Sequence, residues 1–309
     1  MATIETQHDV TGDVVPAVVV PTRYPRWRGL LRSRKLIAGL AIVGFFGLVA
    51  IVGPLLVADP DLVSDDRLLP PSGAHPLGTT NTGQDVFRQL VVATRGSMVV
   101  GVVVGLLATV VSVLVGVVGG YAGGRTDEGF SLVSNVFLVL PGLPLVVLIT
   151  DYVQTRGALA IALIVSITSW AGAARVLRAQ TLSLRARDYV DAARVSGEPD
   201  WRIVTFEILP NLLPLIAAQF VFAVIGGILT EAALAFLGLG GAGSWGTMLY
   251  FAQNSQALSL GAWWWFVPPG LCIALVGAGL ALINFSLDEL INPRLRATPA
   301  RRTRPGGRR

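Results

Sequence analysis

The sequence predicts an all-α membrane protein with six transmembrane helices. Of its 309 residues, 53% are hydrophobic and only 14% are charged, whereas soluble domains carry about 25% charged residues. Charged residues are absent from six segments: 36–57, 98–122, 130–150, 157–174, 208–230 and 262–287. A helix of about 20 apolar residues crosses the roughly 30 Å of membrane hydrocarbon, so each segment suits one span. These features exclude a soluble enzyme, a disordered chain and a secreted disulfide scaffold.

The basic residues predict how these spans are oriented, because cytoplasmic loops are enriched in Lys and Arg. With six spans, alternate loops place 20 of the 24 basic residues on one side. That side holds both termini and loop 175–207, which we therefore expect in the cytoplasm. We interpret segment 36–57 as an uncleaved anchor, since it is longer than a typical signal-peptide core. The arginines of the tails favour contact with anionic lipid over nucleic-acid binding.

The chain lacks the residues that several chemistries require. Lys35 is its only lysine and lies outside any phosphate-binding P-loop pattern. Cys272 is the only cysteine, and His8 and His75 are the only histidines, so we expect no disulfide, metal cluster or multi-histidine site. Residues 238–243 match G-x-G-x-x-G, but they follow a predicted span rather than a strand, and we interpret them as a tight turn. We expect no catalysis, cofactor or metal site in this chain.

Polar and helix-breaking residues inside the spans are the candidates for a translocation path or gate. Asn135, Gln219 and Asn284 are uncharged polar residues of the predicted spans. Pro141 and Pro144 interrupt the third span and should bend it or open its hydrogen-bond ladder. An ion-coupled secondary carrier usually keeps ionisable groups within its spans. Their absence from these segments argues against that class of transporter.

Two acidic residues and a glycine series each leave two interpretations open. Asp151 and Glu231 lie at predicted outer span ends, where each serves as an interfacial cap or as a proton carrier. Glycines at four-residue spacing let helix backbones approach closely. Such a series is formed by Gly101, Gly105, Gly116, Gly120 and Gly124. These glycines serve either close packing within this chain or a contact with another subunit or a moving pathway.

Loop 175–207 has too ordered a pattern for a plain connector. Residues 187–195 suit a short helix, and Gly197 suits the left-handed position that ends a helix. Pro199 suits the first turn of a second helix that leads into the span near Ile208. Such a unit could dock into a cleft of a partner protein, or it could be an ordinary amphipathic loop at the membrane interface. Physical arguments alone leave both interpretations open.

At this loop the chain resembles a known family. DAARVSGEPDWRIVTFEILP (191–210) is similar to the EAA loop of ABC-importer permeases, with its acidic-Ala-Ala triplet and a glycine four residues later. The resemblance covers nearly all of residues 30–296 and is specific to the second permease subunit of the dipeptide/oligopeptide subfamily. Further similar segments are HPLGTTNTGQDVF (75–87), GYAGGRTDE (120–128), EAALAFLGLG (231–240), SWGTML (244–249) and FVPPGLCIAL (266–275).

The resemblance implies a type I ABC-importer permease with a MetI-like core in a bacterial cell membrane. The implied partners are a homologous second permease, two ABC ATPase subunits (or a fused one) that bind ATP and Mg, an extracytoplasmic binding protein and membrane lipid, but no nucleic acid. The EAA loop of such permeases is the coupling helix that inserts into an ATPase. Residue by residue, that role falls to Arg187, Asp188, Tyr189, Asp191, Ala192, Ala193 and Gly197.

The resemblance further implies that the cargo is a short peptide. Nickel or another small ligand is the alternative, since importers of those ligands share the motifs. The chain departs from the family pattern at Asp191, where Glu is usual, and at Glu207. Thr80 and Gln84 replace an Asp and an Arg. These departures leave the coupling assignment standing and the ligand undetermined.

We therefore expect four parts along the chain. They are a partly disordered cytosolic tail (1–35), a first span with its outer loop (36–97), a five-helix core (98–292) and a basic cytosolic tail (293–309). In the second part, residues 83–97 suit an interfacial helix that anchors the chain or contacts the binding protein. Near the end of the core, Trp263–Trp265 suit an aromatic belt or a ligand gate.

Overall fold

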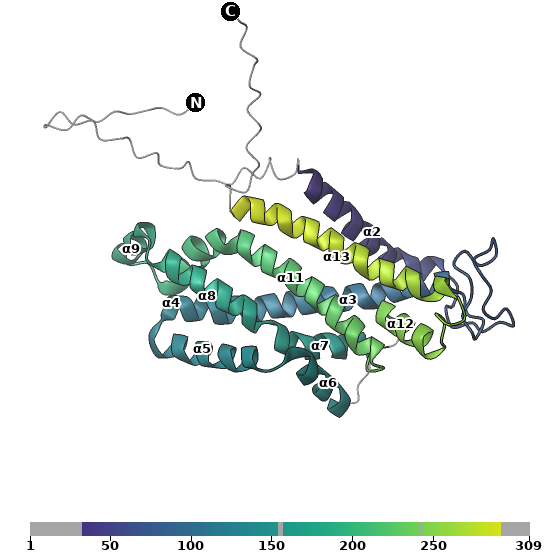
Figure 1. The fold of residues 1–309 in the computed structure, drawn as a ribbon. Helices are drawn as coiled ribbons and strands as arrows, with labels where there is room; N and C mark the ends of the chain where they lie inside the picture. Colours follow the sequence, from purple (N-terminus) through teal and green to yellow (C-terminus); the bar gives the residue numbers. More distant parts are fainter. Residues whose placement is uncertain (1–32, 154–156, 242, 292–309) are drawn as a thin grey trace, which may run out of the picture.

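The computed structural model describes residues 33–153, 157–241 and 243–291, and within these ranges it contains helices and no strand (Figure 1). Four helical stretches are long and apolar enough to cross a membrane alone. They are α2 (Arg34–Leu56), a run over Val86–Ala122, a run over Asp200–Phe236, and α13 (Trp263–Ile291). The predictions for residues 1–32 and for the tail 293–309 lie outside the described residues.

The two runs are each 37 residues long and are composed of several helical segments. The first comprises α3 (Val86–Val113), η1 (Leu114–Val118) and α4 (Gly119–Ala122). The second comprises α10 (Asp200–Arg202), η2 (Ile203–Ile208) and α11 (Leu209–Phe236). In both, η is a π-helical turn inside an otherwise α-helical stretch. At 1.5 Å per residue, each run is about 55 Å long, so it extends beyond the membrane hydrocarbon.

Two further helix pairs are long enough to span only if each bent pair is one span. They are α5 (Gly124–Val139) with α6 (Gly142–Val153), bent by 87°, and α7 (Ala158–Ser169) with α8 (Ala171–Arg185), bent by 44°. The six predicted segments thus correspond to four single spans and two bent pairs.

Local sequence explains the first bend. Leu140 is extended, with φ −69° and ψ 130°, because a residue that precedes proline is disfavoured in the helical region. Pro141 therefore ends α5, and Pro144 lies in the first turn of α6, where proline is tolerated. This confirms the expected interruption. At the second bend, the Trp170 carbonyl accepts a hydrogen bond of 2.8 Å from the Ser112 hydroxyl of α3 as well as one of 3.0 Å from the Ala174 N–H of α8.

The centre of the bundle is the contact between α3 and α11, the most extensive between any two helices. Glycines make it close: a Cβ at Gly101 would lie 2.5 Å from Ile228 Cγ1, and one at Gly105 would collide with Val224. Toward α8, a Cβ at Gly116 would collide with the Ala174 carbonyl. Gly120 likewise faces Arg178 and Thr181 of α8, whereas a Cβ at Gly124 would meet nothing within 4 Å. For the first four glycines, the structure therefore shows packing within this chain.

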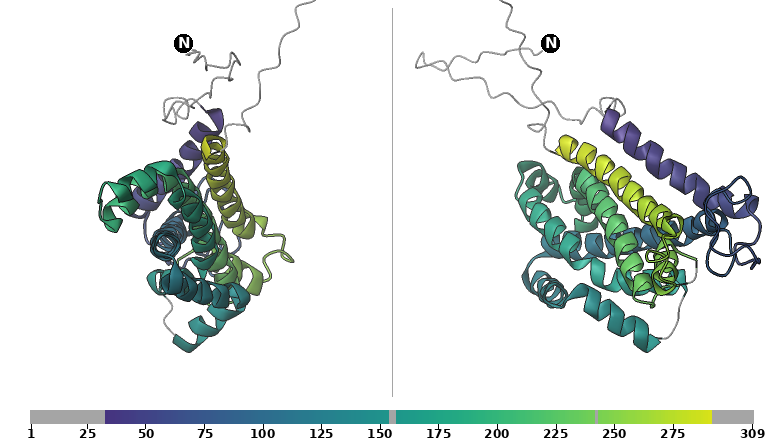
Figure 2. Two further views of the ribbon diagram at one scale, coloured as in Figure 1. Left: turned by 90° about the vertical axis from the view of Figure 1, so that its left-hand side faces the viewer. Right: turned by 45° about the vertical axis from the view of Figure 1, so that its right-hand side comes forward.

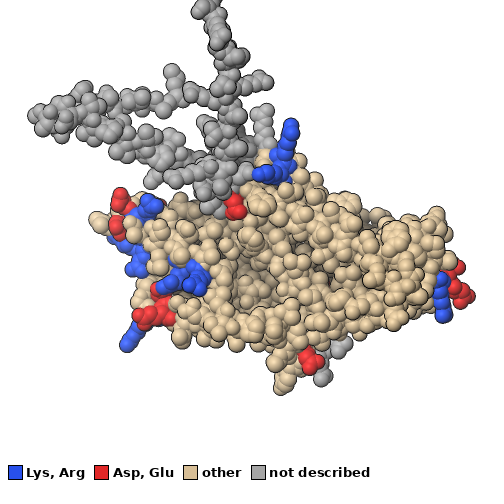
Figure 3. Space-filling view, in the orientation of Figure 1, with Lys and Arg blue, Asp and Glu red and all other residues tan. Residues whose placement is uncertain are grey.

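The remaining helices flank this centre unequally. In both views of Figure 2 and in Figure 1, α2 and α13 lie together on the flank opposite α5 and α6. Only Ser134 of α5 is buried, and only Val146 and Thr150 of α6. On the face shown in Figure 3, charged side chains gather at the α9 (Asp188–Val195) end of the bundle and at the opposite end. A few others lie on the upper and lower edges, and the broad surface between them is uncharged.

The end of the bundle opposite α9 differs from the sequence expectation in two ways. Residues 86–97 do not form a separate interfacial helix: they are the first turns of α3, which the Asp85 carboxylate caps by accepting from the Arg88 N–H at 3.1 Å. The three consecutive tryptophans also lie in three different environments. Trp263 is 54% exposed, whereas the Trp264 indole donates to the Thr79 carbonyl and Trp265 is buried.

Glu231 is not an interfacial cap. Its side chain is 1% exposed within α11, and the buried Ser97 hydroxyl of α3 donates to it at 3.4 Å. The same Ser97 oxygen accepts from the Trp245 N–H at 3.1 Å, at the start of α12 (Trp245–Asn254). Hydroxyl and carboxyl groups thus join three elements at this end of the bundle.

Adjacent glycines of α11 provide a matched test of the central packing. A Cβ at Gly227 would lie 2.8 Å from Val104 Cβ, whereas one at Gly226 meets nothing within 4 Å. We expect Gly227→Ala to destabilise the protein by about 1–3 kcal/mol, because rigid overpacking is unfavourable. Gly226→Ala should be neutral or stabilising by up to about 1 kcal/mol, because alanine favours helix. Thermal unfolding in detergent measures both, and equal effects would contradict the assigned α3–α11 packing.

Candidate functional site

Loop 175–207 forms a helical tip at one end of the bundle (Figure 1). The second half of α8 leads into a bend at Ala186, and α9 (Asp188–Val195) follows with Arg187 as its N-cap residue. Pro199 then precedes α10, which continues into the long run that ends at Phe236. The predicted short helix and second helix are both present, and the second is continuous with a span.

Gly197 ends α9 through a defined hydrogen-bonded turn. Its φ of +81° lies in the left-handed region, which strongly favours glycine. The Gly197 N–H donates to the Arg194 carbonyl at 3.0 Å, and the Glu198 N–H donates to the Ala193 carbonyl at 3.1 Å. This pair of bonds is the Schellman motif, which satisfies carbonyls left open at a helix end. The turn fixes the angle at which the chain leaves α9.

One buried side chain anchors α9 to the bundle. Val190 is fully buried and belongs to an apolar cluster that includes Val117 of η1, Leu177 of α8 and Ile203 of η2. Ala193 packs against the same cluster from the next turn of α9. Full burial of a valine side chain contributes about 1.5–3 kcal/mol, so this contact fixes the helix against the ends of three others.

Tyr121 adds a polar connection to the same anchor. Its hydroxyl donates to Asp200 Oδ1 at 2.8 Å, which links α4 to α10. The Arg194 guanidinium lies 5.4 Å from the ring centroid and that of Arg185 lies 6.0 Å from it, both at cation–π distance. A single aromatic side chain therefore contacts residues of α8, α9 and α10.

Several charged residues at the tip and next to it are paired. Arg194 donates to Asp191 Oδ1 at 2.8 Å on the exposed face of α9. A hydrogen bond to Tyr121 is the largest contribution that raises the pKa of Arg194 above its ordinary value, and Asp191 adds to it. Nearby, Arg178 of α8 makes a two-point contact with the Asp127 carboxylate of α5, at 2.5 and 2.7 Å. This paired geometry favours one relative position of α5 and α8.

The outward face of the tip combines small and apolar side chains. Ala192 and Ser196 are exposed, Val195 is 90% exposed, and Trp201 and Phe206 are 66% and 62% exposed. Exposed apolar side chains in one region of a rigid element are typical of a surface that contacts another protein. The tip can therefore act as a contact surface.

The structure brings the seven predicted coupling residues together in one helix and its flanking turns. Asp188, Asp191 and Ala192 face outward, whereas Tyr189 and Ala193 are half-buried against the bundle. Sequence reasoning missed Tyr121 and Asp200 as their supports. The GYAGGRTDE segment contains the tyrosine, but nothing in its spacing indicates a partner 79 residues away.

The five path candidates are not brought into one site. Asn135, Pro141 and Pro144 are exposed along the α5–α6 bend. Gln219 is half-buried in the middle of α11, and Asn284 is buried in α13, where its amide donates to Asp288 at 3.4 Å. Within the described part of the chain, no hydrogen bond joins any two of them.

Comparison with known proteins identifies the class to which this fold and tip belong. The family described as "Binding-protein-dependent transport system inner membrane component" matches residues 101–297. The family described as "N-terminal TM domain of oligopeptide transport permease C" matches residues 26–71. The chain belongs to the family of binding-protein-dependent inner-membrane permeases, the permease subunits of ABC transport systems. It is thus a multi-pass membrane protein and a transport component.

Individual relatives agree with this assignment. The oligopeptide transport permease OppC of Lactococcus lactis is 33% identical over 230 residues, which are 74% of this chain and 78% of that protein. The dipeptide transport permease DppC of Bacillus subtilis is 34% identical over 277 residues, 87% of this chain and 85% of that protein. A solved structure of the inward-facing MetNI methionine ABC transporter has a TM-score of 0.54 at 20% identity, and the match covers 67% of this chain and 97% of the other. The predicted MetI-like fold is confirmed.

The turn after α9 can be tested at Gly197. Gly197→Ala should cost about 1–2 kcal/mol, because a side chain is disfavoured in the left-handed region. We therefore expect faster hydrogen exchange of the amides of residues 188–198 in the purified protein. Gly197→Asn is the matched control, since asparagine tolerates this conformation, and it should exchange at a rate nearer to that of the native protein. Unchanged exchange in Gly197→Ala would contradict the proposed role of the turn.

Proposed function

We propose that this permease subunit forms half of the membrane path of an importer of short peptides. A homologous second permease forms the other half, and an extracytoplasmic binding protein delivers the peptide. Two ABC ATPase subunits bind ATP and Mg and supply the energy, so the chain itself is non-catalytic and holds no cofactor. Both termini and α9 face the cytoplasm of a bacterial cell, and lipid surrounds the bundle. Family membership and the peptide-permease names of the relatives support this assignment.

The observation that carries the proposal is that α9, whose outward face is exposed and has small side chains, is rigidly attached to the spans. Ala192 and Val195 present little bulk on the outward face of α9, which permits close approach by a partner. On the inward face, Val190 and Tyr121 tie the helix to the ends of α8, η1 and η2. A force on α9 is therefore transmitted to packed helices instead of being absorbed by a flexible loop.

The same geometry suggests how the ATPases drive transport. When ATP binding closes the ATPase pair, α9 moves as a rigid body together with the ATPase surface into which it inserts. Because residues 200–236 form one continuous helical run, displacement of Asp200 moves α11 and the α3 helix packed on it. Rocking of packed helices between two arrangements exposes the path alternately to each side of the membrane.

On this chain, the flank formed by α5 and α6 is a suitable contact surface for the second permease. These helices carry many exposed apolar side chains and bury few residues of their own. They also contain the path candidates Asn135, Pro141 and Pro144. A seam along this flank would place the α5–α6 bend between the two subunits. The exposed apolar residues of these helices and of the bend between them include Leu132, Val133, Val136, Leu138, Val139, Leu140, Leu143 and Leu148.

The cargo is tested by reconstitution of the complete transporter with its binding protein. We expect ATPase stimulation and uptake with di-, tri- or longer peptides and no stimulation with nickel complexes. Stimulation by metal complexes alone would replace the peptide assignment with the small-ligand alternative. Uptake by this chain alone along an ion gradient would instead support a secondary carrier.

Coupling is tested by a bulky side chain on the exposed face of α9. Ala192→Phe should leave the fold intact but obstruct close docking, and should reduce peptide uptake by at least about tenfold, equivalent to about 1.4 kcal/mol. The measurement is uptake together with ligand-stimulated ATP hydrolysis in the reconstituted complex.

Ala179→Phe is the control, since Ala179 is an exposed alanine on the neighbouring helix α8. It should retain uptake. Membrane levels and co-purification of the second permease should be normal for both variants. Normal uptake by Ala192→Phe would mean that α9 is not the coupling contact.

A further inference from the structure

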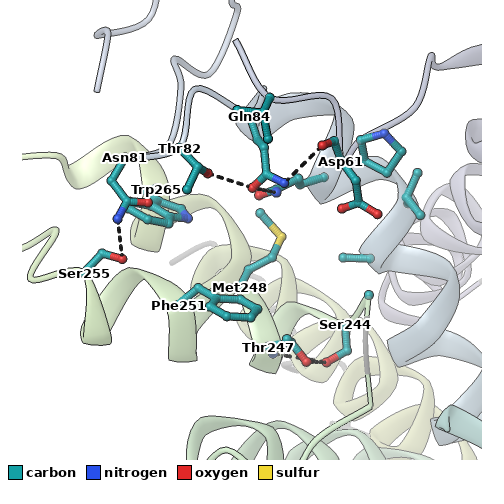
Figure 4. Close-up of a pocket in the computed structure, with 16 residues that line it drawn as sticks. Asp61, Asn81, Thr82, Gln84, Ser244, Thr247, Met248, Phe251, Ser255 and Trp265 are labelled. Carbon is teal, nitrogen blue, oxygen red and sulfur yellow. Dashed lines mark hydrogen bonds between the residues drawn. The ribbon is translucent and has the colours of Figure 1, made fainter. Parts of the chain in front are cut away.

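A cavity of about 580 Å³ opens at the end of the bundle opposite α9 (Figure 4). Its wall comes from four separate segments: the loop before α3, the first turns of α3, the region from Gly243 through α12, and the start of α13. The volume falls in the range of pockets that bind small molecules. In the orientation proposed above, it faces the extracytoplasmic side.

Amide side chains form one wall and hold one another in place. Gln84 Oε1 accepts hydrogen bonds of 3.0 Å from the Thr82 hydroxyl and from Gln89 Nε2. Asn81 Nδ2 donates to the Ser255 hydroxyl at 3.0 Å, which ties this loop to the residue after α12. Asn81 Oδ1 and Gln89 Oε1 accept no hydrogen bond from the described residues, so both are available to N–H donors of a ligand.

The rest of the lining is largely apolar but contains one unsatisfied donor. Met248 and Trp265 are buried, and Phe251 is 55% exposed beside them. The Trp265 indole Nε1–H is buried and has no acceptor in the described part of the protein. Because a buried unpaired donor costs about 1–3 kcal/mol, a ligand carbonyl that accepts from it would be stabilised.

Charge determines which end of a ligand the cavity favours. Asp61 is the one ionisable side chain among the residues that line it, and its carboxylate makes no hydrogen bond or ion pair with the described residues. The surrounding loop adds to this bias, since residues 58–85 contain five Asp and one Arg. A carboxylate with no neighbouring cation attracts an ammonium group and repels a carboxylate.

We propose that this cavity is a ligand site that holds the free amino terminus of a short peptide with an apolar first residue. The ammonium group pairs with Asp61, the peptide N–H groups donate to Asn81 and Gln89, and a peptide carbonyl accepts from Trp265. The apolar side chain packs against Met248 and Phe251. The site rests on the proposed peptide cargo and extends it, because it places a selective contact in the permease itself, ahead of the membrane path.

Photocross-linking in the reconstituted complete transporter tests this site. The probe is a tripeptide whose first residue is a diazirine analogue of leucine, delivered by the loaded binding protein. We expect cross-links at Met248 or Phe251, identified by mass spectrometry. The amino-terminally acetylated tripeptide should compete at least about tenfold less well than the free one, since it lacks the ammonium group.

Two isosteric variants separate charge at the site from charge in its vicinity. Asp61→Asn should reduce the cross-link by at least about tenfold, whereas Asp65→Asn should leave it unchanged, because Asp65 is an exposed acid of the same loop that does not line the cavity. Equal effects of the two variants, or cross-links confined to other parts of the transporter, would overturn the site while native peptide uptake persists. A failure of the proposed function would give a different result, because the native transporter would then take up no peptide at all.

Discussion

The close contact of α3 with α11 is the constraint on which the rest of the structure depends. Gly101, Gly105 and Gly227 remove side chains where the two backbones approach, which permits dense apolar packing along the middle of this contact. Each helix belongs to a run of 37 residues that is longer than the hydrocarbon is thick. One run ends at Ala122, next to Tyr121, and the other begins at Asp200, so both connect the tip to the far end of the bundle.

Polar side chains join helices at both ends of this largely apolar centre, and each end uses them differently. At the tip, Tyr121 and the paired arginines fix the position of α9 while its outer face remains open. At the far end, Glu231 and Ser97 join α3, α11 and α12 in a buried network. Beside this network lies the cavity, where amides are only partly satisfied. The tip thus presents a preformed surface to a partner, while the far end retains donors and acceptors for a ligand.

Much of the fold could be predicted from sequence because membrane insertion leaves a strong compositional signal. A charge at the bilayer centre is unfavourable, so charge-free segments of the right length mark the spans. Local backbone chemistry is also readable: Gly197 predicted the end of α9, and Pro141 predicted the break between α5 and α6. The positions of residues near the predicted ends of the spans were predicted less well. Residues 86–97 continue a span, Glu231 is buried, and the three consecutive tryptophans have three different environments.

By itself, the sequence determined the helical membrane class, the approximate spans, and the helix–glycine–helix unit of loop 175–207. Each follows from the properties of residues that are close together in the chain. Only the tertiary structure decided which glycines pack against which helix, that Tyr121 supports α9, and that Asp61, Gln89 and Trp265 line one cavity. Those contacts join segments that are far apart in the sequence. Burial and hydrogen bonding depend on the neighbours that folding brings together, so no local sequence pattern encodes them.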